Sequence, residues 1–294
     1  MNERQNEKRL APVEIKSALE LYNPVVSALA DRKKGLIAST ASPFRALAKY
    51  IPYFFAGDLV VVAGRPSMGK TALALNFALS FAKIGNVLVF SLEMSIDQLI
   101  IRLLSTICKV SMNTIQHDKE FAWQDHKPAL QASKEALGNL YIDDTSLLTP
   151  ELIGERVAYF VEQHKIVAVV VDYLQLMKVP GEDSREREIA ECSLFLKALA
   201  KTYKVPVFAL SQLNRGLEQR GNKRPVLADL RDSGAIEQDA DIVIFIFRED
   251  YYNQNAVEGE TELIVAKHRN GPTGHCTVMF DAPTTTFFDL GGQK

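Results

Sequence analysis

The sequence lacks the features that would assign it to a disulfide-rich, metal-binding or membrane class. Only three cysteines occur in 294 residues, Cys108, Cys192 and Cys276, and they have no metal-ligand spacing. An odd, scattered set is typical of buried thiols in a reducing compartment. No apolar run approaches the roughly 20 residues that span a bilayer, and the polar N-terminus has no signal-peptide core. The sequence therefore predicts a cytoplasmic protein without membrane contact.

An excess of positive charge is also missing. Lys and Arg total 34 against 36 for Asp and Glu, a formal net charge of −2. Any nucleic-acid contact is therefore expected to be local, through a loop or channel rather than the whole surface. Hydrophobic residues make up 47% of the chain, enough for a full core. Without internal repeats, one large α/β domain with appendages is expected, and two domains are the alternative.

The rest of the chain is organised around Gly64-Arg65-Pro66-Ser67-Met68-Gly69-Lys70-Thr71. An apolar run precedes this stretch and a helical pattern follows it, the context of a phosphate-binding P-loop. Gly64 and Gly69 let successive N–H groups point at a polyphosphate. Lys70 can reach the β- and γ-phosphates, and the Thr71 hydroxyl can ligate Mg²⁺. We predict nucleoside triphosphate binding; the alternative is a chance glycine turn before a helix.

Strands and helices alternate after the P-loop. Strands are expected over residues 59–63, 87–91, 140–143, 166–172, 206–210 and 241–247. Helices are expected over residues 72–82, 97–107, 149–164 and 189–201, with a mostly helical stretch at 109–138. Short strands follow at 262–268, 277–280 and 286–289. The pattern predicts an α/β fold with a mostly parallel central sheet and antiparallel C-terminal additions.

The segments between these elements are predicted to be irregular or to lie outside the sheet. Residues 13–34 carry an apolar stripe that predicts one or two amphipathic helices, the second beginning at Asn23-Pro24. Residues 36–56 are expected to be a mixed connection, and 182–187 a charged loop. We therefore divide the chain into an N-terminal linker segment, residues 1–35, and a P-loop domain, residues 36–294. The apolar face of the linker would cover its own domain or a neighbouring subunit.

Two carboxylates are candidates for chemistry at the phosphates. Asp172 closes a β-branched strand, as a Walker B aspartate does, and can orient Mg²⁺ beside Thr71. The next residue is Tyr173, where many AAA+ proteins have a catalytic glutamate. Glu93, just after strand 87–91, is the predicted replacement that orients the attacking water, a RecA-like arrangement. The alternatives are an ordinary strand-terminal aspartate and a solvated glutamate that caps the next helix.

Polar groups also stand at the ends of two later strands. Gln212 can hydrogen-bond the γ-phosphate or the attacking water, although such amides are also common in inert turns. Lys267 and Arg269 flank a histidine after a late strand, where a solvated edge is the alternative to a site. Arg65 lies inside the P-loop and can point away, so the loop supplies no arginine for the γ-phosphate. An arginine finger from a neighbouring subunit would fill that gap.

The stretch 230–241 is dense in polar groups just before a strand. Ser233-Gly234 permits a tight loop with exposed N–H groups, which could bind phosphates without a base-specific code. A purely structural loop is an equal alternative.

Together these stretches resemble the DnaB-type replicative helicases, the RecA-fold ring motors of bacterial replication. The matching pieces, in the family's order over about residues 56–290, are GDLVVVAGRPSMGKTALALN, VFSLEMS, VDYLQLM, LSQLNRGLEQR, KRPVLADLRDSGAIEQDADIV and AKHRNGPTG. The resemblance implies a RecA-like three-layer fold with helices on both faces of the sheet. It also implies ATP and Mg²⁺ as ligands.

The resemblance implies a role for each matching residue. In the family's active site the roles would be phosphate and Mg²⁺ binding by Lys70 and Thr71, the Walker B acid Asp172, the catalytic base Glu93, the γ-phosphate sensor Gln212, and the trans-acting cations Lys267 and Arg269. Arg231, Asp232 and Gly234 would lie in the loop that grips the DNA backbone inside a hexameric channel. The segment 13–34 matches the family's linker helix, which docks on an adjacent subunit.

The implied function is that of an ATP-dependent DNA helicase motor. The family forms homo-hexamers that translocate 5′ to 3′ on single-stranded DNA and works with a primase and a helicase loader. Its additional N-terminal helical domain, which interacts with primase, has no counterpart in this sequence. One alternative is a RecA/RadA-like recombinase; the stretch LRDSGAIEQDAD argues against it. The other is a non-translocating ATP-dependent loader or switch, which would lack Glu93, Gln212 and Arg269.

Overall fold

The computed structural model describes residues 40–179, 181 and 184–291, together with residues 17, 18, 20, 22, 26 and 27. The side chains of residues 231–233 lie outside the described part. The chain divides into two units, Met1–Ser39 and Thr40–Lys294. In the first unit the described residues 18, 20, 22, 26 and 27 are helical and Ser17 is not, and the remaining residues of the expected linker, including Asn23-Pro24, lie outside the described residues.

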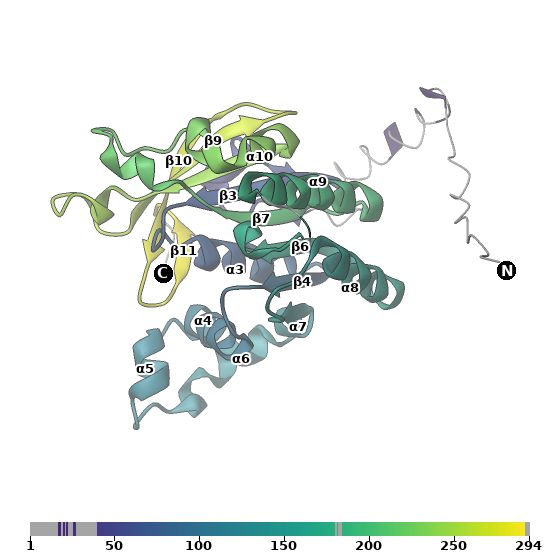
Figure 1. The fold of residues 1–294 in the computed structure, drawn as a ribbon. Helices are drawn as coiled ribbons and strands as arrows, with labels where there is room; N and C mark the ends of the chain where they lie inside the picture. Colours follow the sequence, from purple (N-terminus) through teal and green to yellow (C-terminus); the bar gives the residue numbers. More distant parts are fainter. Residues whose placement is uncertain are drawn as a thin grey trace. The chain divides into compact units, whose positions relative to one another are not determined.

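A nine-stranded sheet forms the centre of the second unit, in the order β11-β10-β9-β8-β3-β7-β6-β4-β5 (Figure 1). The parallel strands are β3 (Leu59–Gly64), β4 (Asn86–Ser91), β5 (Leu140–Asp143), β6 (Ile166–Asp172), β7 (Val207–Gln212) and β8 (Ile242–Phe247). The antiparallel strands are β9 (Glu260–His268), β10 (Gly274–Asp281) and β11 (Thr286–Asp289). The predicted mostly parallel sheet with antiparallel additions is confirmed.

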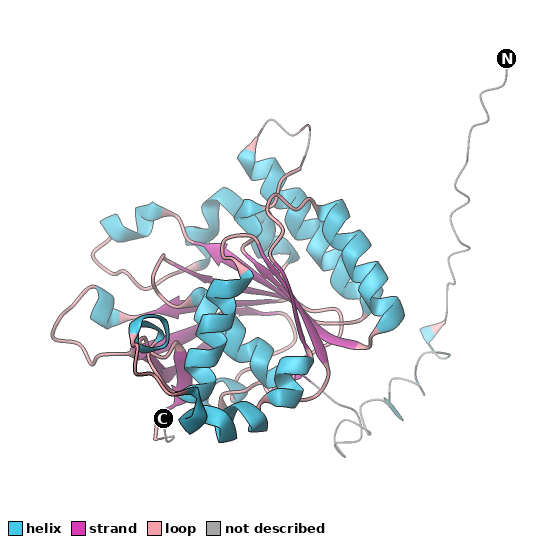
Figure 2. Ribbon diagram, turned by 90° about the horizontal axis from the view of Figure 1, so that it is seen from below, coloured by secondary structure: helices cyan, strands magenta, loops and turns pink. Residues whose placement is uncertain are grey.

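Helices cover both faces of the sheet and complete three layers (Figure 2). One face packs against α2 (Arg45–Ala48), α3 (Lys70–Phe81) and α7 (Lys134–Gly138). The other packs against α8 (Pro150–Gln163), α9 (Arg185–Tyr203) and α10 (Gly234–Asp239). Because successive strand residues point to opposite faces, Val60 and Val62 belong to the first core, and Leu59, Val61 and Ala63 to the second.

Aromatic packing fixes the helix that follows the P-loop. Phe77 and Phe81 of α3 are fully buried, and both rings lie against Phe208 of β7, with centroids 5.7 Å and 5.3 Å away. Phe54 closes the cluster with its centroid 4.9 Å from that of Phe208. Such tilted and edge contacts add to the burial of apolar area. This packing fixes the C-terminal half of α3 beside the starts of β3 and β7.

A group of short helices precedes β5. It begins with α4 (Ile96–Cys108), whose N-terminus is closed by a capping box of Ser95 and Gln98. The following pieces are α5 (Met112–His117), η1 (Trp123–His126) and α6 (Lys127–Ala132), which confirm the mostly helical prediction for 109–138. Leu99 and Leu103 bury α4 against Leu75 of α3, so α4 borders the P-loop helix.

Two predicted loops are wrong, and the mixed connection contains short elements. Residues 36–56 contain a small antiparallel pair, β1 (Thr40–Ala41) with β2 (Tyr53–Phe54), besides α2. The helix α9 begins at Arg185, so 185–187 are not a loop; acidic residues in the first turn favour a helix N-terminus. The expected tight loop at 230–241 is η4 (Leu227–Ser233) followed by α10, and Asp229 accepts the Val226 N–H at the start of η4.

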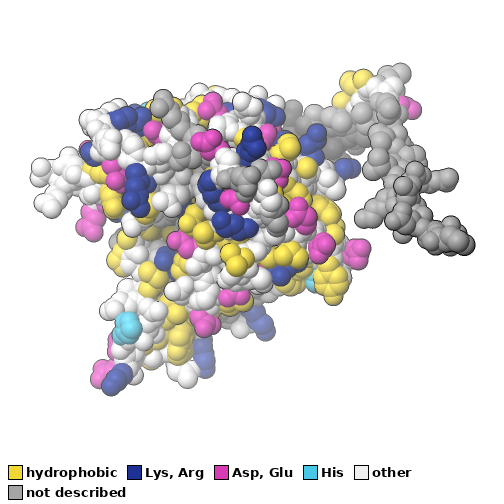
Figure 3. Space-filling view, viewed as in Figure 1, with side chains coloured by type: hydrophobic (Ala, Val, Ile, Leu, Met, Phe, Trp, Pro, Cys, Tyr) yellow, Lys and Arg dark blue, Asp and Glu magenta, His cyan; other side chains and the backbone are white. Residues whose placement is uncertain are grey.

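The surface and the thiols agree with the composition. Figure 3 shows Lys and Arg interspersed with Asp and Glu rather than as a coat of one sign. All three cysteines are buried free thiols, as predicted, and burial raises the pKa of Cys192 to about 12. In the described part of the chain, no helix is long and apolar enough to cross a bilayer.

Candidate active site

The P-loop joins β3 to α3, and its second glycine has a backbone conformation that other residues rarely adopt. Gly69 has a φ of +94°, which L side chains rarely adopt, and it is the residue directly before α3. Met68 is 1% exposed and anchors the loop in the core. Lys70 Nζ donates to the carbonyl of Arg65, 3.1 Å away. Burial lowers the pKa of Lys70 to about 8, because the chain's own groups compensate its charge only in part. A polyphosphate would supply the remainder.

Thr71 and Asp172 meet across the loop. Thr71 Oγ1 donates to Asp172 Oδ2 over 2.7 Å. Asp172 ends β6 and is 4% exposed, and this burial is the main cause that raises its pKa to about 6. A hydroxyl and a carboxylate beside a phosphate loop suit Mg²⁺, which takes few protein ligands and completes its shell with water and phosphate oxygens. The two residues fit the predicted Mg²⁺ site.

Glu93 reaches the same site through the pairing of β4 with β6. β4 is not adjacent to the P-loop strand β3, because β6 and β7 lie between them. β4 pairs instead with β6, in a register that sets Ser91 opposite Asp172. Glu93 is exposed two residues beyond Ser91, and its charge raises the pKa of both Asp172 and Lys70. The carboxylate therefore stands at the phosphate end of the sheet.

Arg102 is a site residue that the sequence reasoning missed. It lies on α4, and it interacts electrostatically with both Asp172 and Glu93. Its Nε is buried and has no hydrogen-bond partner among the described residues. Burial lowers the pKa of this guanidinium, which suits a group awaiting an anion. The sequence feature that could have identified Arg102 is its position as a lone cation in the otherwise apolar stretch LIIRLLST.

Arg65 points away from the loop centre, as the sequence allowed. Its side chain is 6% exposed and donates to the Leu213 carbonyl and to Glu218, each over 2.8 Å. It therefore ties the P-loop to the segment after β7, which includes η3 (Arg215–Gln219).

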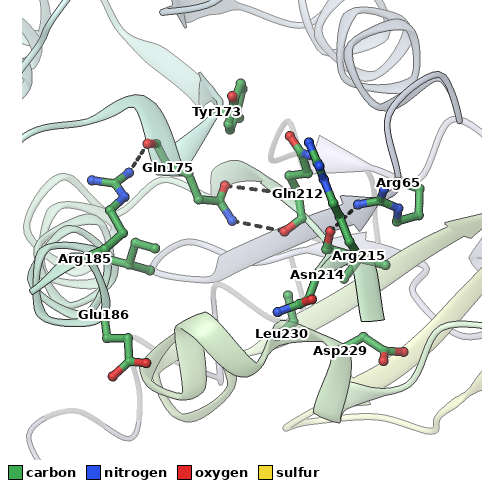
Figure 4. Close-up of a pocket in the computed structure, with 12 residues that line it drawn as sticks. Arg65, Tyr173, Gln175, Arg185, Glu186, Gln212, Asn214, Arg215, Asp229 and Leu230 are labelled. Carbon is green, nitrogen blue, oxygen red and sulfur yellow. Dashed lines mark hydrogen bonds between the residues drawn. The ribbon is translucent and has the colours of Figure 1, made fainter. Parts of the chain in front are cut away.

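Gln212 lines a cavity of about 520 Å³ beside the P-loop (Figure 4). Its backbone pairs with Gly64 in the β3–β7 register. Gln175, in η2 (Leu174–Leu176), holds that backbone: its Oε1 accepts the Gln212 N–H and its Nε2 donates to the Gln212 carbonyl, both at 3.2 Å. Arg185 in turn donates to the Gln175 carbonyl. Gln175 therefore links the end of β6 to the end of β7, a role not predicted from the sequence.

Lys267 and Arg269 lie at the opposite edge of the sheet from the P-loop. β9 runs antiparallel to β8, so that His268 pairs with Ile242, and Ile242 pairs with Val60 near the start of β3. At about 3.3 Å per residue, the two ends of β3 are roughly 17 Å apart. The two cations therefore cannot reach the P-loop of their own chain.

The expected DNA-contacting residues lie in η4 and α10. Arg231 and Asp232 have helical backbones, and their side chains lie outside the described part. Gly234 is the exposed first residue of α10, with a φ of −53°. A Cβ there would meet nothing within 4 Å. Neither backbone conformation nor packing within the described chain requires glycine at this position.

Comparison with known proteins assigns the chain to a family. The family model described as "DnaB-like helicase C terminal domain" matches residues 40–289. The chain belongs to the DnaB-like helicase C-terminal domain family. The replicative DNA helicase DnaB of Haemophilus influenzae is 45% identical to this DnaB-like chain over 245 residues, covering 81% of it and 52% of the relative. That of Pasteurella multocida is 44% identical over 268 residues, covering 88% and 57%.

Solved structures agree with this DnaB-like fold. A solved chain described as an "ATPase Domain" superposes with a TM-score of 0.86 at 33% identity, covering 94% of this chain and 100% of that one. "The Structure Of A DnaB-Like Replicative Helicase And Its Interactions With Primase" gives a TM-score of 0.81 at 33% identity, covering 94% and 68%. The RecA-like three-layer fold is thereby confirmed. The DnaB-like chain spans about half the length of the curated relatives cited above.

Proposed function

We propose that this chain is the ATP-hydrolysing motor of a homo-hexameric replicative DNA helicase, which translocates 5′ to 3′ on single-stranded DNA and unwinds duplex at a fork. The observation that carries the proposal is the division of the site across the sheet. The P-loop, Asp172 and Glu93 gather at one edge, while Lys267 and Arg269 lie at the other. Such a chain needs a neighbour to complete each active site, which a closed ring supplies at every interface.

Hydrolysis follows from what each side chain can do at the phosphate edge. Mg²⁺ held by Thr71 and Asp172 would neutralise charge on the β- and γ-phosphate oxygens. Lys70 and Arg102 bring two positive charges to the phosphates from the chain itself. Glu93 orients a water for in-line attack and accepts its proton. The charge of Glu93 acts on both Asp172 and Lys70, which supports Glu93 as the base.

The remaining groups would sense and complete the reaction. Gln212 donates from its side-chain amide to the γ-phosphate or the water, and Gln175 fixes its backbone. Lys267 and Arg269 act on the nucleotide of the adjacent subunit, where a trans arginine contributes a factor of about 10³ or more to turnover.

DNA binding is assigned to the junction of η4 and α10 at Gly234, which we call the DNA loop. Gly234 has no internal reason to be glycine, which supports a close approach by an external backbone such as a DNA phosphate. Arg231 and Asp232 are assigned to the same contact. Readout of phosphates alone gives binding that does not depend on base sequence.

The proposal extends to the setting of the motor. A cytoplasmic location, contact with a primase and delivery to DNA by a helicase loader accompany replicative unwinding. A recombinase or an ATP-dependent loader is less well supported, because the relatives cited above are described as replicative helicases.

Two assays on the purified chain test this function. ATP hydrolysis measured with and without single-stranded DNA should rise several-fold on DNA addition. Forked duplexes with a single 5′ tail or a single 3′ tail should differ, with unwinding only from the 5′ tail. Stimulated hydrolysis with unwinding from neither tail, combined with strand exchange, would favour the recombinase instead.

A further inference from the structure

Asp241 lies between the two cations assigned to the neighbouring active site and the interior of the sheet. It immediately precedes β8 and is 6% exposed. One carboxylate oxygen, Oδ2, accepts the Leu59 N–H at 2.7 Å and a bond from Lys197. The other, Oδ1, accepts from the Arg269 guanidinium at 3.3 Å. The Asp241 carbonyl also accepts the Arg269 N–H at 2.8 Å, so both parts of Asp241 hold Arg269.

The same cations are tied to the end of α10. Lys267 Nζ donates to the carbonyls of Glu237 and Gln238, the latter at 3.2 Å. Arg269 Nη2 donates to the Gln238 carbonyl as well. Free carbonyls at a helix C-terminus carry partial negative charge and suit cations. The helix α10 therefore begins at Gly234 of the DNA loop, and its last carbonyls are hydrogen-bonded by Lys267 and Arg269.

Arg269 is nevertheless available to a neighbour. Its side chain is 46% exposed, whereas the Asp241 side chain behind it is 8% exposed. A guanidinium has five N–H donors in a fixed plane. The guanidinium donates hydrogen bonds to Asp241 and Gln238, and its remaining N–H donors are available to an external phosphate.

We propose that Asp241, together with the last carbonyls of α10, is a positioning residue that aims Arg269 and Lys267 at the nucleotide of the adjacent subunit and joins them to the DNA loop. The inference rests on the proposed function. It gives a role to Asp241, a residue of the matching stretch to which the resemblance assigned none, and through it a shift of α10 on DNA reaches the neighbouring active site. The competing view is that Asp241 only joins β3, β8 and α9 through Leu59 and Lys197.

Asp241→Asn tests the positioning role, because Asn keeps the shape but removes the charge that holds Arg269. In rings made only of this variant, DNA-stimulated ATP turnover should fall by at least about tenfold, the effect expected from loss of one charge-assisted hydrogen bond. Their stimulation ratio, turnover with DNA over turnover without it, should also fall. An unchanged ratio would overturn the link to the DNA loop.

Mixing subunits identifies where the defect acts. Asp241→Asn subunits keep an intact P-loop, and Lys70→Ala subunits keep intact cations, so rings of both should recover turnover. No recovery in mixed rings verified by mass, or full turnover by the pure variant, would overturn the proposal. If Asp241→Asn does not assemble, Asp241→Glu, which displaces the carboxylate by one methylene, carries the same test.

A matched control is available on a distant surface. Asp125 is exposed in η1, and Asp125→Asn makes the same change of charge. It should leave turnover within about twofold. An unmodified chain without DNA-stimulated turnover would contradict the proposed function itself, whereas an active parent with no rescue contradicts only the role of Asp241.

Discussion

Thr71 and Asp172 share a hydrogen bond of 2.7 Å that joins the first turn of α3 to the last residue of β6. Each residue is fixed by its own element: α3 by the buried phenylalanine cluster, and β6 by pairing on both sides. The hydroxyl and carboxylate therefore stand together before any ligand arrives. This pre-organisation is what binding of a hydrated Mg²⁺ with phosphate requires.

Replacing Glu93 with Gln should remove hydrolysis but not nucleotide binding. The amide keeps the size of the side chain and cannot accept a proton, so steady-state ATP turnover should fall by about 10²-fold or more. Affinity measured with a fluorescent ATP analogue should stay within a few-fold of the parent. The matched control is Glu162→Gln, an exposed position near the end of α8. Turnover that persists in Glu93→Gln would refute the assignment of the base.

Lys70→Met should stabilise the nucleotide-free chain while abolishing ATP binding. The folded-state pKa of Lys70 is about 8 against its usual 10.5, so at neutral pH the folded chain holds a charge that burial disfavours. Each pKa unit is worth about 1.4 kcal/mol, and after solvent screening we expect a gain of about 1–2 kcal/mol at pH 7.

The pH dependence of this gain has a fixed sign. Between about pH 8 and pH 10.5 the folded parent has released the proton that the unfolded chain still binds, so the parent's stability rises with pH. The advantage of Lys70→Met should therefore shrink over that range in chemical unfolding curves. A gain that stays constant with pH would show that burial of the charge is not its cause.

Arg102→Ala should weaken ATP binding by about tenfold, the value of one charge-assisted hydrogen bond. The buried Nε without a partner in the described chain is the basis of this expectation. Arg187→Ala removes an exposed arginine from α9 and serves as the control, with affinity unchanged. Isothermal titration of both variants measures the difference, and equal affinities would leave Arg102 without a role in binding.

Gly234→Ala should separate DNA binding from stability. Its backbone is already helical and a Cβ meets nothing, so alanine should keep or raise the thermal midpoint by reducing the entropy of the unfolded chain. Affinity for single-stranded DNA, measured by fluorescence anisotropy, should drop several-fold because the Cβ blocks close approach of a phosphate. Gly138→Ala, also in open space but in α7, should change neither affinity nor turnover. Undiminished DNA affinity in Gly234→Ala would contradict the proposed contact.

Period and motif spacing predicted the parts of this fold that local chemistry determines. Apolar runs closed by Asp172 and Gln212 became the buried strands β6 and β7, because a run of β-branched or apolar residues flanked by polar ends has few other stable arrangements. The start of α9 at Arg185 was missed because its first turn is polar. Its carboxylates favour a helix N-terminus, yet in sequence they read as a charged loop.

The order of the strands across the sheet could not be predicted from the sequence. The path from Glu93 to the site passes through the β4–β6 pair, which no local pattern specifies. Arg102 and Gln175 likewise become site residues only through packing of α4 on α3 and of η2 beside β7. The placement of Lys267 and Arg269 away from their own P-loop follows from the antiparallel turn of β9, again a property of topology.

The central claim is that each active site takes its cations from the next subunit, and subunit mixing measures this most directly. Arg269→Ala and Lys70→Ala are each expected to be inactive as uniform rings. In randomly mixed rings about a quarter of the interfaces pair an intact P-loop with intact cations, and DNA-stimulated ATP turnover should reappear in that proportion. Absence of turnover in mixed rings of verified composition would contradict the shared site.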